Sequence, residues 1–329
     1  MGIWTYRHLF TKDVKPQFRL SLGEGNTPCT NCDKLAKHMG VKYVYLKRED
    51  LNPTGSFKDR SIAFQISAYL QSGKKDFVIS SSGNAAISAI GYCRKANCNL
   101  HVYISDKIPD EKLIRVFETA YIDEIDFTGI RSGEIKQITK LDLTLNFTSR
   151  AKSDALKFSR KKGFVYLRGS TDDLAPVGYK TISYELVKQV KQIDAIFIPC
   201  SSGASTLGIY SGFYDVDKPC PRLHIVQTTK IHPIASIYDQ QYKKSETSLS
   251  SAISDRVALR KDQVSNIVTK SGGTGWVVND DEIDEARRIL NESCGIKTSY
   301  DSALSLAGFK KALLHNHNIK IPLLILSGK

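Results

Sequence analysis

The sequence predicts an α/β fold in which mostly parallel sheets are flanked by helices. Short apolar runs alternate with longer helical patterns along the 329 residues, and three polar, glycine-containing turns lie after apolar runs and before helical patterns. Strands that alternate with helices of about 10–15 residues are typical of crossover units and parallel sheets. A chain of this length is expected to form roughly two domains of about 150 residues each.

The apolar runs and helical periods predict the individual elements. Strands are expected at VKYVYL (41–46), HVYIS (101–105), FVYL (164–167), LHIVQT (223–228) and IPLLILSG (321–328), and at the starts of 77–96 and 195–213. Helices are expected at 61–73, from about 179 to 192, at 280–290, and at the ends of 77–96 and 195–213. The serine- and lysine-rich segment from about 234 to 266 is expected to be a long, partly mobile connection.

Charge and hydropathy exclude several classes of protein. The net charge is +13, but the lysines and arginines are spread along the chain and form no long basic tract with aromatics, so nucleic acid is not an expected partner. No apolar run approaches the roughly 18 residues of a membrane span. The start, MGIWTYRHLFTKDVK, lacks an apolar secretion core. We therefore expect a cytoplasmic protein with no membrane partner.

The cysteines favour reduced thiols. Their number is seven, which is odd for a framework of disulfides. Cys29 and Cys32 form a CxxC pair, but no second pair follows to complete a zinc site. We expect free thiols and no metal.

The first polar turn, in PTGSFKDRS (53–61), places one lysine at a helix start. Lys58 follows Gly55 and Ser56 and stands near the start of a predicted helix. A helix N-terminus and burial both disfavour the ammonium form, and a neutral amine can attack an aldehyde. The same pattern is also compatible with a lysine that extends from a helix start into solvent.

The other two turns offer groups for an anion and an oxygen. SSSGNAA (80–86) contains Asn84, whose amide can donate to a phenolic oxygen, and PCSSGAST (199–206) combines Gly203 with several hydroxyls at a helix start, which suits a phosphate. Each turn alone is equally compatible with a simple helix cap. Amine, amide and phosphate cradle together suggest pyridoxal 5′-phosphate, a cofactor that stabilises carbanions at the α-carbon of amino acids.

The ordered motifs resemble the fold-type II pyridoxal-phosphate enzymes, and within them the threonine synthase family most closely. The most specific strings are LGEGNTP (22–28) and KREDLNPTGSFKDR (47–60). They are followed in order by SSGNAAIS (81–88), VGYKTISYE (177–185), SGGTGWVVNDDEI (271–283) and ILSGK (325–329). The resemblance implies a two-lobed fold like that of the tryptophan synthase β subunit. Residues 50–150 would form a small lobe, 1–49 plus 151–329 would form a large lobe with the phosphate loop, and the cofactor would lie between them.

The resemblance also implies a role for each matching residue. Lys58 would bind the cofactor covalently and move the substrate's α-proton, Asn84 would donate to the ring's phenolic oxygen, and Ser327 would face the pyridine nitrogen. Ser81 and Ser82 would lie beside the substrate carboxylate. The phosphate loop would consist of Ser201, Ser202, Gly203, Ala204 and Ser205.

Several positions depart from the threonine synthase pattern. Ala85, in the substrate site, stands where a reactive threonine is usual, and Ala175 stands where an arginine helps to hold the substrate's phosphate. Nearby Asp172 and Asp173 would repel a phosphate. Ser202 replaces an asparagine. Ser299 and Tyr300 replace a glutamate–proline pair before the last helix.

Three functions follow from the resemblance. The first is a carbon–oxygen lyase of threonine biosynthesis that converts O-phosphohomoserine to threonine and phosphate. The second is another fold-type II lyase or a β-replacement enzyme, of serine/threonine dehydratase or cysteine synthase type. The third is a non-catalytic paralogue that binds pyridoxal phosphate or an amino acid. Family members are commonly dimers, so a homodimer acting on a small amino acid is one expectation.

Overall fold

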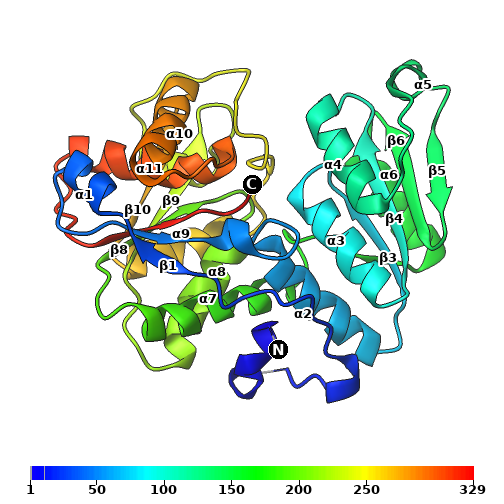
Figure 1. Ribbon diagram of the computed structural model, residues 1–329, viewed down its shortest axis with the longest axis horizontal. Helices are drawn as coiled ribbons and strands as arrows, with labels where there is room; N and C mark the ends of the chain where they lie inside the picture. The colour runs from blue at the N-terminus through cyan, green and yellow to red at the C-terminus, as the bar shows by residue number, and fades with distance from the viewer. Residues whose placement is uncertain (1, 11) are drawn as a thin grey trace. The chain divides into compact units, whose positions relative to one another are not determined.

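The computed structural model describes residues 2–10 and 12–329 and has the α/β architecture that the sequence predicts (Figure 1). The chain divides into two compact units. Unit 1 comprises Met1–Glu24 and Lys58–Arg168, and unit 2 comprises Gly25–Phe57 and Gly169–Lys329.

Unit 1 is built on a five-stranded sheet in the order β5-β6-β4-β3-β7. All neighbouring strands are parallel except the edge strand β5, which pairs antiparallel with β6. The strands are β3 (Asp76–Ser80), β4 (Asn99–Ser105), β5 (Gln137–Lys140), β6 (Leu143–Thr148) and β7 (Val165–Tyr166). The helices are η1 (Gly2–Leu9), η2 (Pro16–Phe18), α2 (Lys58–Gln71), α3 (Asn84–Lys95), α4 (Asp110–Ala120), α5 (Phe127–Ser132) and α6 (Ala151–Lys162).

The N-terminal segment of unit 1 packs on α2. The Trp4 ring stacks on Phe64 with centroids 5.8 Å apart, and the Leu20 amide donates to Ser67 Oγ at 2.9 Å. These contacts explain why residues before Glu24 belong to the same unit as Lys58–Arg168.

Unit 2 is built on a six-stranded sheet in the order β1-β2-β11-β8-β9-β10. Only β1 is antiparallel to its neighbour. The strands are β1 (Cys29–Asn31), β2 (Tyr45–Lys47), β8 (Ala195–Pro199), β9 (Arg222–Thr228), β10 (Thr274–Val278) and β11 (Pro322–Ile325). The helices are α1 (Asp33–Met39), η3 (Glu49–Leu51), α7 (Ala175–Gln189), α8 (Ala204–Asp215), η4 (Ala235–Ile237), α9 (Lys261–Lys270), α10 (Asp280–Cys294) and α11 (Tyr300–Leu314).

The sheet of unit 2 is buried on both faces. Along β8, Ala195 and Phe197 belong to a core with α1, α10 and α11, whereas Ile196 and Ile198 belong to a second core with α7, α8 and α9. Alternate residues of a strand point to opposite faces, so a strand covered by helices on both sides must be apolar throughout. AIFIP meets this requirement.

Several boundaries differ from the sequence expectation. Strand β2 begins at Tyr45 and not at residue 41, and α2 begins at Lys58 and not at residue 61. Helix α7 begins at Ala175, before the expected start near residue 179, because Pro176 lies in the first turn, where the helix needs no amide hydrogen. The helix ends at Gln189. The expected connection from 234 to 266 contains η4 and the first residues of α9. Its remaining part is shorter than the composition suggested.

The strings that carry the family resemblance meet at a buried ion pair. Lys47 Nζ lies 2.6 Å from Glu185 Oε2, and the side chains are 0% and 1% exposed. Lys47 also donates to the Thr27 carbonyl at 2.7 Å, and the Asn26 amide donates to Glu185 Oε1 at 2.7 Å. The pair therefore ties the end of β2 to α7 and to the GNTP stretch.

The expectation of free thiols is wrong for two cysteines. Cys32, which precedes α1, forms a disulfide with Cys294 at the end of α10, and their Cα atoms are 6.1 Å apart. The partners are separated by 262 residues, so no local spacing could reveal them. Burial raises the pKa of Cys29 to about 11, which keeps this thiol protonated. In the described part of the chain, no cluster of three His, Cys, Asp or Glu side chains is placed to hold a metal.

Every helix within residues 2–10 and 12–329 is too short or too polar to cross a bilayer.

A buried histidine in β9 makes the stability of unit 2 sensitive to acid. His224 is 1% exposed, its Nδ1 accepts from Trp276 Nε1 at 3.1 Å, and its ring stacks on Phe197. Burial, followed by the charges of Arg222 and His317, lowers the pKa of His224 to about 3. The folded protein therefore keeps this ring neutral.

We expect the buried ion pair to dominate stability in unit 2. Removal of one partner by Glu185→Gln leaves a buried ammonium without its counter-charge, which costs about 3–5 kcal/mol of unfolding free energy. The exposed pair Arg288–Glu292, at 3.9 Å, provides the control, since Glu292→Gln should cost less than about 1 kcal/mol. Urea unfolding measures both values, and equal losses would contradict this account of the pair.

We also expect acid to destabilise the protein through His224. The unfolded ring titrates near 6.5 and the folded ring near 3, so the unfolded state binds more protons between these values. Full stability is present above pH 6.5, and lowering the pH to 5 should cost about 2 kcal/mol through this group. Urea unfolding at pH 7 and pH 5 should show a smaller difference for His224→Gln, which keeps an acceptor for Trp276. An unchanged difference would exclude His224 as the source.

Candidate functional site

The chain that leads into Lys58 is fastened to residues 327–329. The Phe57 amide donates to the Ser327 carbonyl at 3.0 Å, and the Lys329 amide donates to the Gly55 carbonyl at 2.9 Å. Gly55 has φ +88°, a conformation that favours glycine. Lys58 follows Phe57 directly and is the first residue of α2, three residues before the helix start that the sequence predicted. The turn before Lys58 is therefore a fixed structure, and buried Ser327 belongs to it.

The turn after β3 presents Asn84 at the first position of α3. Asn84 Oδ1 accepts from Arg115 Nη2 at 3.4 Å, and Arg115 belongs to α4. An amide whose oxygen is engaged in this way presents its NH₂ group to other partners. In the same turn the Gly83 amide donates to Ser81 Oγ at 3.2 Å. Ser82 and Ala85 flank Gly83 and Asn84 in the chain.

The turn after β8 forms an open helix start. Gly203 immediately precedes α8, has φ +87°, and no side chain of the described residues caps the helix there. The first amides of a helix have no acceptor within it, and together with the helix dipole they attract an anion. Ser201, Ser202 and Ser205 add hydroxyl groups at this end. The donor set suits a phosphate monoester.

A second segment packs against this turn and fixes its shape. A Cβ on Gly203 would lie only 2.2 Å from Val264 Cγ2 of α9. Ser201 Oγ accepts from the amides of Ser254 and Asp255 at 3.1 and 3.3 Å. The hydroxyl hydrogen of Ser201 is left to donate, because these two contacts use only its oxygen lone pairs.

Comparison with known proteins identifies the family of the chain. A model of the family described as "Pyridoxal-phosphate dependent enzyme" matches residues 20–328. The chain belongs to this family. Its cofactor is therefore pyridoxal 5′-phosphate, as the three turns predicted.

Several similar curated proteins are threonine synthases. The chain is 28% identical to threonine synthase of Methanocaldococcus jannaschii over 95% of its length and 76% of the relative. It is 27% identical to threonine synthase of Methanosarcina acetivorans, over 94% of this chain and 74% of that one. It is 30% identical to threonine synthase of Synechocystis, over 94% of this chain and 77% of that one.

Solved structures confirm the fold class. Maize serine racemase superposes with a TM-score of 0.73 at 21% identity, covering 92% of this chain and 88% of the other. The processed form of threonine deaminase isoform 2 from Solanum lycopersicum superposes with the same TM-score at 21% identity, covering 99% of this chain and 84% of the other. At this identity the likeness establishes the fold-type II architecture.

In this pyridoxal-phosphate enzyme, the region around Ala175 differs from what the sequence suggested. The carboxylate of Asp172 accepts from the Leu174 amide at 2.9 Å, so it is engaged at the start of α7. A guanidinium that sequence reasoning missed, that of Arg260, donates to the Asp172 carbonyl at 2.8 Å and lies 3.6 Å from the Asp173 carboxylate. A cation therefore accompanies the two acids.

Ser299 and Tyr300, the remaining departures, have structural contacts. Ser299 precedes α11, accepts from the Ser302 amide, and donates through Oγ to the Gly328 carbonyl at 2.7 Å. The Tyr300 ring lies under the guanidinium of Arg287, whose central carbon is 4.4 Å from the ring centroid. Ser299 thus supports the residue that follows Ser327.

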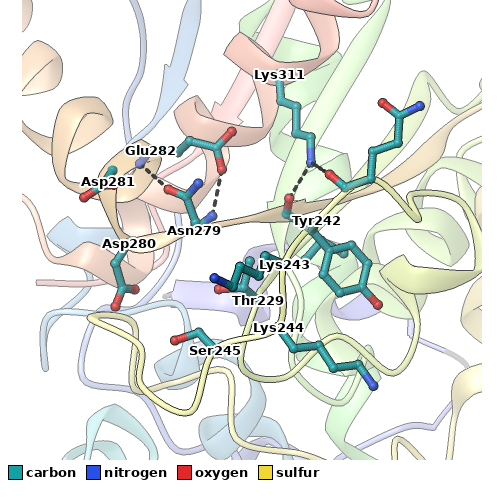
Figure 2. Close-up of a pocket in the computed structure, with 12 residues that line it drawn as sticks. Thr229, Tyr242, Lys243, Lys244, Ser245, Asn279, Asp280, Asp281, Glu282 and Lys311 are labelled. Atoms are coloured by element: carbon teal, nitrogen blue, oxygen red, sulfur yellow. Dashed lines mark hydrogen bonds between the residues drawn. The ribbon is translucent and has the colours of Figure 1, made fainter.

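A cavity of about 440 Å³ lies elsewhere in unit 2, at the ends of β9 and β10 (Figure 2). It is lined by Lys243, Lys244, Asp280 and Asp281 among others, and none of the predicted site residues lines it. Lys311 enters it with its charge already paired, because its ammonium lies 2.7 Å from both Asp239 Oδ2 and the Val277 carbonyl.

We expect Gly203→Ala to damage the turn after β8 more than a glycine substitution elsewhere damages its own turn. A non-glycine residue at positive φ costs about 1–2 kcal/mol, and displacing Val264 adds about 1–3 kcal/mol. Gly163 has φ +72° and open space around its Cβ position, so Gly163→Ala isolates the backbone cost. Urea unfolding and the cofactor dissociation constant measure the effects. Indistinguishable variants would show that the close approach of Val264 is unimportant.

Proposed function

We propose that this enzyme is a carbon–oxygen lyase of threonine biosynthesis that converts O-phosphohomoserine and water to threonine and phosphate. The observation that carries the proposal is the match to threonine synthases along 94–95% of the chain. The motifs around Lys58, Asn84 and the turn after β8 support it.

We assign the cofactor contacts to the residues that the sequence analysis singled out. Lys58 would hold the cofactor through its amine, Asn84 through its amide NH₂, and Ser327 would face the pyridine nitrogen. The phosphate would rest on Ser201, Ser202, Gly203, Ala204 and Ser205. In this proposal the lobe of residues 50–150 supplies Asn84, and the lobe of 1–49 plus 151–329 supplies the phosphate loop.

The chain's own groups would then bind the substrate and move its protons. When bound, pyridoxal phosphate withdraws electrons from the substrate's α-carbon. Lys58 Nζ would take the α-proton and afterwards help to transfer a β-proton, which requires the neutral amine. Ser81 and Ser82, beside Ala85, would donate to the substrate carboxylate. Phosphate leaves the γ-carbon with the electrons of the broken C–O bond, and water adds at the β-carbon.

A second function is favoured by a specific observation. Ala85, Ala175 and Ser202 lack the threonine, arginine and asparagine side chains of the threonine synthase pattern. A lyase or β-replacement enzyme of serine or threonine needs no site for a γ-phosphate, so these residues suit it as well. A non-catalytic paralogue that binds the cofactor or an amino acid is the third reading. A cytoplasmic location stays a prediction.

We expect Lys58→Ala to abolish turnover and the visible absorbance of the bound cofactor together. Loss of a positioned general base lowers kcat by about 100- to 10,000-fold. The matched control is Lys74→Ala, which removes an exposed lysine just beyond α2 and should leave both properties unchanged. Borohydride should remove the absorbance from the wild type.

A substrate panel on the purified protein separates the three functions. Threonine and inorganic phosphate formed from O-phosphohomoserine in equal amounts support the proposal. Ketoacid from serine or threonine, without any response to O-phosphohomoserine, would replace it by the dehydratase type. Normal cofactor absorbance without turnover of any substrate would favour the non-catalytic paralogue.

A further inference from the structure

The segment before α9 is fastened across the phosphate turn of unit 2. At one end, Ser250 Oγ and the amides of 251 and 252 all donate to Asp301 Oδ1 at 2.6–2.9 Å. Further along, the amides of Ser254 and Asp255 donate to Ser201 Oγ. The composition predicted a partly mobile connection here, but these bonds hold residues 250–252 against the start of α11 and residues 254–255 against the turn after β8.

The segment ends in a buried arginine. Arg260 is 7% exposed and immediately precedes α9. Val264 lies one turn later on the same face of that helix, and this is the residue that contacts Gly203. The face of α9 that carries Arg260 therefore packs toward the start of α8.

The guanidinium of Arg260 is incompletely paired. Nη2 donates to the Asp172 carbonyl at 2.8 Å, but Nε is buried and has no hydrogen-bond partner among the described residues. Its carboxylate neighbour, Asp173, has a side chain that is 97% exposed and lies 3.6 Å away, a contact that water screens strongly. A buried charge with an open donor is costly unless a ligand completes it.

We propose that Arg260 binds a phosphate monoester dianion beside the starts of α7 and α8. A guanidinium matches the geometry of phosphate oxygens and keeps its charge at every physiological pH. The phosphate turn otherwise offers neutral donors, so Arg260 supplies the full positive charge that the sequence lacks at Ala175. The dianion is the γ-phosphate of the substrate, which rests on the proposed function, or the 5′-phosphate of the cofactor, which does not.

The test compares Arg260→Gln with the matched control Arg256→Gln. Arg256 is an exposed arginine of the same segment, so its substitution changes the net charge equally. The first arm titrates cofactor-saturated protein with inorganic phosphate and with O-phosphohomoserine and follows the cofactor absorbance. The second arm compares the dissociation constants of pyridoxal 5′-phosphate and pyridoxal for the cofactor-free protein.

We expect Arg260→Gln to weaken phosphate binding by about 10- to 100-fold in one arm, with Arg256→Gln close to the wild type. Loss in the first arm alone identifies the substrate's phosphate. Loss for pyridoxal 5′-phosphate but not pyridoxal identifies the cofactor's phosphate. Unchanged constants in both arms would overturn the proposal.

Two further outcomes keep the test decisive. Asp173→Asn retains the guanidinium and removes its competing carboxylate, so it should tighten phosphate binding. This variant tests the proposal if Arg260→Gln fails to fold. Weaker or unchanged binding in Asp173→Asn would count against the proposal. A wild type that binds phosphate through Arg260 but does not turn over O-phosphohomoserine would refute the proposed function and leave this inference standing.

Discussion

The arrangement of unit 2 depends on the contact between Lys47 and Glu185. A buried charge is tolerated only when a partner of opposite sign and further hydrogen bonds satisfy it. Here the ammonium contacts Glu185, Gln189 and the Thr27 carbonyl, while the second carboxylate oxygen receives the Asn26 amide. The short strand β2 is thereby positioned relative to α7, and the turn that leads to Lys58 continues from it. Part of the family resemblance thus reflects structural support rather than reacting groups.

In the proposed phosphate site after β8, neutral donors and one charged group would contribute differently to anion binding. Backbone amides and hydroxyls at the start of α8 would orient the anion, since each donor has a fixed position. The positions of these donors depend on Gly203 and on the segment of residues 250–260, which packs against the turn. In our proposal the Arg260 guanidinium adds a long-range attraction that dipoles alone do not provide. Position and charge therefore come from segments that are distant in sequence.

Sequence reasoning predicted the fold class and the placement of the three turns because both rest on local patterns. AIFIP followed by a small-residue turn has the period of a buried strand before a helix, and the structure has β8 and α8 there. The hairpin strand β5, with its mostly exposed residues, has no such pattern. Arg115, Arg260 and the Cys32–Cys294 link escaped because each depends on a tertiary contact between remote segments. Only their side-chain chemistry, not their partners, is visible in the sequence.

The position of β11 has a consequence for how the protein is made. This strand is the last of the described elements in chain order, yet it lies between β2 and β8 in the middle of the sheet. During synthesis on the ribosome, β2 and β8 emerge long before the strand that joins them, so the sheet stays divided until translation has passed residue 325. The turn before Lys58, which pairs with residues 327–329, is completed at the same late stage. An unfinished nascent chain consequently lacks both the central strand of this sheet and the backbone partners of the turn before Lys58.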